Sequence, residues 1–432
     1  MSILVLFSIV FLFYTFLAFS AKSSSILGIL FFIVFFISIF SNSSVLGLLP
    51  HSFVAFIKYI DEAYVCFAFF YFLFFNLKKT DVLFLLLITI YFLSGFISGI
   101  KNDASLNVIF QGGLLSLKGP MLFFVGKHLL IKDDIYKKIN TYCIWFFWLT
   151  ICLSIVDFLL GDIYKDFFHI YSDSRFDIIA VSGFFAHPSD NASCLLICII
   201  LFITFYRKHH IKFLLFIGTF LLMTFRVKEI VSFFILTPIF SEKNIKKKII
   251  IIVIIIFAMS GIYKHIMPKH FNAYFGDVYN TQYARNALTI TSAVIAKENF
   301  PFGEGFGRFG GHISAKFYSL VYEKYSISNV FGLSEEFNSF IADTFWPMIL
   351  GESGLLGLLL YLLILFYVFL PFFNKQKCLD KNSIAIRNVF LMFLIISIAA
   401  PIFVRPPYYF IFGFAALVQK RREECENNSE KE

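Results

Sequence analysis

The stretch ILGILFFIVFFISIF, residues 26–40, interrupts its strongly apolar residues with only one glycine and one serine. A second stretch, KKIIIIVIIIFAMSGIY at 247–263, is similar, and apolar runs between them recur at lengths that suit helices crossing about 30 Å of hydrocarbon. The chain of 432 residues is 59% hydrophobic and 15% charged, which leaves too little polar surface for a soluble protein. The sequence therefore predicts an all-α fold, a polytopic bundle of about 12–13 transmembrane helices with one large extracytoplasmic loop.

Short basic segments between the apolar runs determine the predicted orientation. They are LKKT (77–80), IKDDIYKK (131–138), RKHHIK (207–212), SEKNIKKK (241–248), NKQKCLDKNSIAIR (374–387) and the tail from 419. The positive-inside rule places such segments in the cytoplasm, and one orientation satisfies all of them. It also places RVKE, residues 226–229, on the exterior side, where the rule does not explain its basic residues.

This orientation divides the chain into four parts. They are an N-terminal transmembrane bundle with predicted spans that include 3–20 and 248–263 (1–263), a large periplasmic or exterior loop (264–343), C-terminal transmembrane helices that end in a short span at 407–418 (344–420), and a charged cytoplasmic tail (421–432).

The net charge and the cysteines exclude several classes of function. The formal net charge is +9, but the basic residues cluster in short loops between spans, which favours membrane topology over nucleic-acid binding. The seven cysteines include no pair in a long exterior loop, so the sequence predicts neither a disulfide framework nor a metal site.

The exterior loop contains two recognisable elements. Apolar residues at helical spacing in RNALTITSAVIAKE, residues 285–298, predict a surface helix with Arg285 near its start. The segment PFGEGFGRFGG, residues 301–311, predicts an irregular turn because of its glycines. Its match to GxGxxG does not follow a strand or open a helix, so we reject nucleotide binding. We expect Gly303, Gly305 and Gly307 to let the backbone approach a substrate closely.

An ordered set of motifs now suggests a family. The set is GFFAHPSDNAS (183–193), FRVKE (225–229), YARNAL (283–288), PFGEGFGRFG (301–310) and EEFNSFIADTFWPMILGESGLLGLLLYLLIL (335–365). In this order, over about residues 180–375, the chain resembles the Wzy-type bacterial O-antigen and exopolysaccharide polymerases and the related O-antigen ligases.

The resemblance implies an enzyme of the inner (cytoplasmic) membrane. Such an enzyme would be an inverting, metal-independent glycosyltransferase without a cofactor that moves a glycan from an undecaprenyl diphosphate carrier onto an acceptor at the outer face. Its expected partners are the lipid-linked donor and acceptor, membrane lipids, a chain-length regulator and a flippase.

A lipid diphosphate leaving group requires fixed cations at the membrane surface. The planar guanidinium group of arginine suits this task because it binds phosphate oxygens in pairs and stays charged. Arg226 and Arg285 match basic positions of the family pattern, and Lys228 is a third candidate. Without a functional role, Arg226 would be a helix-end arginine with Glu229 as its counter-ion, and Arg285 would belong to a solvated helix.

The acceptor hydroxyl must also lose a proton, which calls for a base. In the ligases, the resemblance implies a histidine shortly before the long helix that follows the loop, but Asn338 stands there in this chain. The remaining candidates are Glu336, Asp343 and His312. Glu352 is favoured as a helix-packing residue because its neighbours are small.

His187 and Asp190 in AHPSDN are predicted either to bind the acceptor sugar or to begin the following helix. Two other functions stay open beside the polymerase. One is a ligase that transfers the finished glycan to the lipid A core, against which the missing histidine argues. The other is a flippase or transporter of lipid-linked oligosaccharide, but such proteins usually contain two related halves, and no internal repeat is evident here.

Overall fold

The chain is described by a computed structural model. The structure describes residues 24–131, 133–175, 178–205, 210–241, 283–373 and 380–429. The predicted spans at 3–20 and 248–263 lie outside these ranges, as does the first part of the predicted exterior loop.

The described residues confirm an all-α fold. The helices that form the bundle are α2 (Ser24–Phe40), α3 (His51–Phe75), α4 (Val82–Lys101), α5 (Leu106–His128), α6 (Asp133–Leu160), α8 (Pro188–Phe205), α9 (His210–Leu222), α10 (Val227–Ser241), α16 (Trp346–Phe369), α17 (Lys381–Ile396) and α18 (Ile411–Ser429). Five helical stretches, at α4, α5, α6, α8 and α16, are long and apolar enough to cross a membrane, and α2 is a shorter apolar helix. The protein is therefore a helical membrane protein.

Short elements connect or cover these helices. They are the 3-10 turns η1 (Ser44–Leu48), η2 (Lys79–Asp81), η3 (Ile341–Asp343), η4 (Leu370–Phe372) and η5 (Tyr408–Phe410), the helices α7 (Asp162–Phe167), α13 (Ala284–Glu298), α14 (His312–Lys316) and α15 (Val321–Lys324), and the strands β1 (Ser174–Arg175) and β2 (Ile178–Ile179). The two strands pair antiparallel, with Ser174 opposite Ile179.

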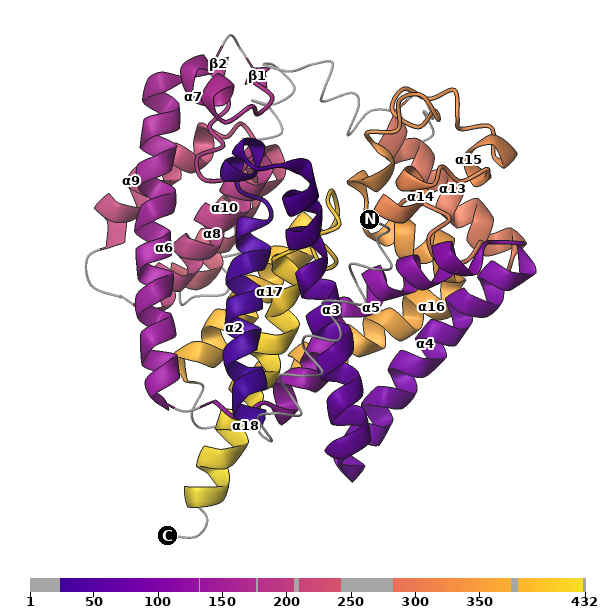
Figure 1. The fold of residues 1–432 in the computed structure, drawn as a ribbon, viewed down its shortest axis with the longest axis horizontal. Helices are drawn as coiled ribbons and strands as arrows, with labels where there is room; N and C mark the ends of the chain where they lie inside the picture. The colour runs from indigo at the N-terminus through magenta and orange to yellow at the C-terminus, as the bar shows by residue number, and fades with distance from the viewer. Residues whose placement is uncertain are drawn as a thin grey trace.

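The predicted exterior segments share one end of the molecule. Figure 1 shows α7, β1 and β2 at the same end as α13, α14 and α15, and the C-terminus at the opposite end. This arrangement agrees with the orientation inferred from the basic segments. The boundary expected at residue 420 lies inside α18, because the helix runs without a break from the apolar core into the charged tail.

Small residues bring the central helices close together. A Cβ on Gly126 of α5 would lie 2.7 Å from the carbonyl oxygen of Gly413 in α18, so α5 needs glycine at this crossing. Phenylalanines fill the space around it, and the Phe31 ring lies 5.4 Å from those of Phe410 and Phe414. The α5–α18 pair thus forms the centre of the bundle.

The part of the predicted exterior loop that the structure describes has a core of its own. The predicted helix is present as α13, and its buried face includes Leu288 and Ile295. Tyr322 and Leu333 are fully buried against the same cluster. Residues 283–343 are therefore a folded cap over the bundle.

The glycine-rich segment 301–311, which we call the glycine turn, attaches this cap to the bundle. Gly307 lies directly against Gly112 of α5, and Gly305, with φ of +104°, lies against Gly99 of α4. The peptide nitrogens of Gly305 and Gly307 donate to the carbonyl and side-chain oxygens of Glu352, at 2.8 and 2.9 Å. Glu352 is buried, and its hydrogen bonds join α16 to this turn.

Candidate functional site

Four basic side chains converge beneath the cap, and each has a carboxylate partner. The ion pairs are Arg226–Asp173, Lys228–Glu229, Arg285–Asp343 and Arg405–Asp190, which we call the paired-charge cluster. Its members come from the 171–173 segment, α8, the start of α10, α13, η3 and the segment before η5. The fold thus gathers residues that are far apart in the chain.

Arg226 lies in the tight turn between α9 and α10. The preceding residue, Phe225, has a φ of +51°, a left-handed conformation that costs a residue with a Cβ roughly 1–2 kcal/mol. The guanidinium group of Arg226 donates to the carboxylate of Asp173. Because the peptide nitrogen of Val181 donates to the Met223 carbonyl at 3.1 Å, the same turn is also bound to the segment that follows β2.

Lys228 and Glu229 begin α10 at the edge of a small pocket. Glu229 is fully buried, and its carboxylate accepts hydrogen bonds from the hydroxyls of Ser189 at 2.7 Å and Ser193 at 3.2 Å. The Lys228 ammonium lies 3.9 Å from the same carboxylate oxygen. Arg405 also lines the pocket. The pocket therefore places two cationic side chains and two serine hydroxyls around the Glu229 carboxylate.

Arg285 projects from the first turn of α13, as the sequence predicts. It donates to the carboxylate of Asp343, in η3, at 2.9 Å. Both side chains are partly exposed, at 29% and 37%. Arg285 and Asp343 also lie close enough to Lys228 to interact with its charge. This contact joins the cap to the bundle electrostatically.

Arg405 is the fourth cation, and it was not among the predicted site residues. It donates to the carboxylate of Asp190 at 2.7 Å, and the Tyr408 hydroxyl donates to the Asp190 carbonyl at 3.1 Å. Burial alone would lower the pKa of Arg405, but the Asp190 carboxylate and other nearby acids raise it above its ordinary value. Arg405 thus stays charged in a protected position.

The signal for Arg405 is present in the sequence. The segment PIFVRPPYYF, residues 401–410, contains a single basic residue on the predicted exterior side, where the charge rule does not require one. The same reasoning applies to RVKE at 226–229.

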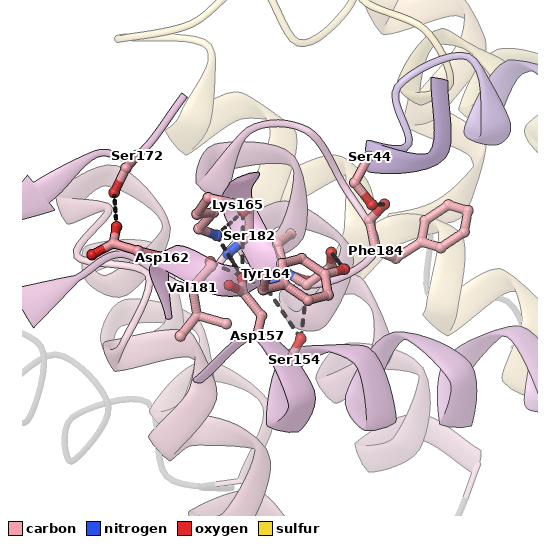
Figure 2. Close-up of polar contacts among 12 residues, drawn as sticks. Ser44, Ser154, Asp157, Asp162, Tyr164, Lys165, Ser172, Val181, Ser182 and Phe184 are labelled. Atoms are coloured by element: carbon pink, nitrogen blue, oxygen red, sulfur yellow. Dashed lines mark hydrogen bonds and ion pairs between the residues drawn. The ribbon is translucent and has the colours of Figure 1, made fainter. Parts of the chain in front are cut away.

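A buried polar network holds the segment that follows β2 in place before α8. Figure 2 shows Lys165 of α7 and Ser182 directed at Asp157 of α6. The Asp157 carboxylate accepts from the Lys165 ammonium at 2.7 Å and from the peptide nitrogens of Ser182 and Gly183 at 2.6 and 2.8 Å. Because these groups are buried, the network fixes the segment that leads into Asp190.

The remaining predicted residues occupy different places. Asp190 is in the cluster, whereas the Nδ1 atom of His187 accepts from the peptide nitrogen of Ser189 at 3.2 Å and so takes part in the start of α8. Asp343 is held by Arg285, while Glu336 is exposed on the cap. His312, at the start of α14, lies apart from the four ion pairs and near charged residues of α3 and α5.

The predicted glycines do not line the paired-charge cluster. A Cβ on Gly303 would come within 2.8 Å of the Glu352 backbone, and Gly305 and Gly307 contact α4 and α5. The close backbone approach that they permit is to the protein's own helices. Nothing in the geometry supports a contact between these three residues and a substrate.

Within the described ranges, no three histidine, cysteine or acidic side chains converge as ligands for a metal ion. Comparison of the chain with protein-family models and with curated proteins gives no significant match. The fold and the site therefore define the class: an all-α membrane protein with a folded cap and a cluster of paired charges beneath it.

Proposed function

We propose that this protein is a polysaccharide polymerase of the inner membrane. It would transfer a glycan from an undecaprenyl diphosphate carrier onto an acceptor repeat unit at the outer membrane face, as an inverting and metal-independent glycosyltransferase. The partners in this proposal are the lipid-linked donor and acceptor, with a flippase that supplies them and a regulator of chain length.

One observation carries the proposal: Arg226, Lys228, Arg285 and Arg405 converge on the cap side of the bundle. A diphosphate carries several negative charges, and it leaves more readily when fixed donors stabilise the charge that grows on its bridging oxygen. Arginine forks bind such oxygens in pairs. A polyprenyl tail would lie in the membrane while its diphosphate reached this cluster.

The carboxylate partners give the cations a fixed orientation before substrate arrives. Asp173, Asp190 and Asp343 each hold one guanidinium group, so binding does not have to order three long side chains. Cap and bundle both contribute, since Arg285 comes from α13 and Arg405 from the segment before η5. The donor would therefore be held between them.

Deletion of the gene tests the proposed activity. A polymerase deletion should remove the long-chain ladder on a glycan gel and leave a band of one repeat unit. Complete loss of glycan from the lipid A core would instead indicate a ligase or a flippase, and an unchanged ladder would exclude all three functions.

A reconstituted assay tests the chemistry directly. The purified protein in lipid nanodiscs should lengthen undecaprenyl diphosphate-linked repeat units that are extracted from the deletion strain. The reaction should continue in EDTA if it is metal-independent. Failure of the purified protein to extend these lipids, under conditions in which it restores ladders in cells, would contradict the assignment as the sole polymerase.

A further inference from the structure

A second group of charged side chains lies on α3 and α5, outside the paired-charge cluster. Lys58 and Glu62 are one turn apart on α3 and so share a face of the helix. Lys118 of α5 donates to the Glu62 carboxylate at 3.1 Å. The Lys118 side chain is only 2% exposed, whereas that of Glu62 is 26% exposed. Lys118 therefore holds the Glu62 carboxylate, which stays partly exposed to solvent.

Further contacts fix this pair. Asp61 is buried and accepts from the Tyr409 hydroxyl at 2.6 Å. The Lys118 ammonium lies 5.0 Å from the centre of the Tyr409 ring, in a cation–π contact. Two carboxylates and an aromatic ring thus surround one ammonium. Their arrangement leaves Glu62 as the member of the group that solvent can reach.

One charged neighbour of Glu62 comes from the cap. His312, at the start of α14, has an exposed side chain and interacts electrostatically with Lys58, Lys118 and Glu62. Glu62 is 11 residues into the 25-residue α3, about 16 Å from its start. Charged side chains at such a depth face protein or water and not lipid, because exposure to hydrocarbon is costly. Lys58 and His312 therefore lie near the partly exposed Glu62 carboxylate, one on α3 and one on the cap.

A short stretch of chain connects the group around Glu62 to the paired-charge cluster. Arg405 binds Asp190, and four residues later Tyr409 binds Asp61, the neighbour of Glu62. Four residues span at most about 14 Å between Cα atoms, and less where they form the turn η5. The Arg405 side chain and the diphosphate that it binds could together extend over such a distance, which would bring the anomeric carbon bonded to the diphosphate toward Glu62.

From these contacts we infer that Lys58, Glu62 and His312 form an acceptor-saccharide subsite, in which the Glu62 carboxylate receives the proton of the attacking hydroxyl. The inference rests on the proposed transfer reaction and deepens it. Sugar hydroxyls are donors and acceptors at once, so a site with a carboxylate, an ammonium and an imidazole suits them. Lys118 and Asp61 are positioning residues, because they act through Glu62.

The acceptor oxygen forms a bond to the anomeric carbon of the donor sugar, from the face opposite the diphosphate. The bond from that carbon to the diphosphate oxygen breaks, and its electron pair leaves with undecaprenyl diphosphate, which the paired-charge cluster stabilises. The hydroxyl proton passes to Glu62 and then to water.

The test uses the full-length protein in nanodiscs with the extracted lipid-linked repeat unit. Glu62→Gln keeps the shape of the side chain but removes the base, so extension should fall by about 10² to 10⁴-fold. Binding of undecaprenyl diphosphate alone, followed by thermal shift, should remain as in the wild type. Glu62→Asp should restore part of the activity, and Glu335→Gln, an exposed change on the cap, should have no effect.

The outcomes separate the two proposals. Extension by Glu62→Gln within threefold of the wild type would overturn the acceptor subsite and leave the polymerase assignment standing. A wild-type protein that extends nothing would refute the polymerase assignment, and the subsite with it. Lys58→Ala serves if Glu62→Gln does not accumulate, because Lys58 is exposed. It should weaken acceptor use about tenfold with unchanged carrier binding, and unchanged acceptor use would overturn the subsite.

Discussion

Asp190 and Arg405 are 215 positions apart in the chain, yet their side chains are joined by a hydrogen bond of 2.7 Å. The contact ties the start of α8 to the segment before η5. Since Asp190 also accepts from the hydroxyl of Tyr408, at 3.5 Å, a single carboxylate holds both ends of the turn in place. The paired-charge cluster depends on this connection for the position of its fourth cation.

Breaking the Asp190–Arg405 pair should reduce both stability and activity. Asp190→Asn leaves Arg405 without its charged partner, which should lower the free energy of unfolding by about 2 kcal/mol. Thermal unfolding in detergent measures this loss. In a double-mutant cycle with Arg405→Gln, the double variant should lose less stability than the sum of the two single losses. Additive losses would contradict a direct pair.

Removing either predicted arginine should abolish chain extension. Arg226→Ala and Arg285→Ala each delete one donor to the diphosphate, for which a loss of about 10² to 10³-fold is expected. Lys297→Ala is the matched control, because Lys297 is an exposed cation on the same helix as Arg285. Normal glycan ladders from both arginine variants, at wild-type protein levels, would refute the role of the cluster in binding diphosphate.

The close approach of α5 to the glycine turn should not tolerate a methyl group. A Cβ at residue 112 would collide with Gly307 and come 2.8 Å from the Phe306 carbonyl carbon. Gly112→Ala should therefore destabilise the protein by about 1–3 kcal/mol and expose the cap to limited proteolysis. Gly218→Ala is the control, since its nearest neighbour would be a ring atom of Phe233 at 3.5 Å. Equal protease resistance of both variants would contradict this account.

Glu352 should matter for the attachment of the cap. Glu352→Ala removes the acceptor of the Gly307 peptide nitrogen and leaves a cavity, at a cost of about 2 kcal/mol. Glu352→Gln retains an acceptor oxygen and should lose less. The order of melting temperatures tests the argument, which would fail if the glutamine variant melted below the alanine variant.

Acid should weaken the cap through His312. Desolvation by surrounding protein, with the charges of Lys316, Lys118 and Lys58, lowers the pKa of His312 below its ordinary value of 6.5, although Glu62 opposes the shift. Below pH 6.5 the unfolded chain therefore binds a proton before the folded chain does, so stability falls as pH falls toward the lowered pKa. Melting curves between pH 7.5 and 5 should show this decline, and His312→Gln should reduce it.

Sequence patterns predicted the elements that form because of residues within the same segment. The apolar spacing of residues 285–298 predicted α13, and the glycines of 301–311 predicted an irregular turn. The carboxylate partners Asp173 and Asp343 could not be assigned in this way, because each pairs with an arginine more than 50 positions away. Long-range pairing depends on how the helices pack, and no periodicity within one segment encodes it.

The glycine turn shows the same division. Its composition correctly indicated close approach of the backbone, but the neighbour is α4, α5 and α16 of the same chain. A glycine that lets a helix approach and a glycine that lets a ligand approach cannot be distinguished in a sequence. The place of Arg405 on the predicted exterior side is visible in the sequence, but its carboxylate partner is 215 positions away and no local pattern encodes that pairing.

The way in which the glycine turn enters the bundle limits how such proteins can be recombined. Gly305 and Gly307 lie against Gly99 and Gly112, so the cap and these helices have matching surfaces at the level of single atoms. Exchange of residues 283–343 alone between related chains would pair a foreign turn with unmatched helices. A functional chimera would have to carry α4, α5 and α16 along with the cap.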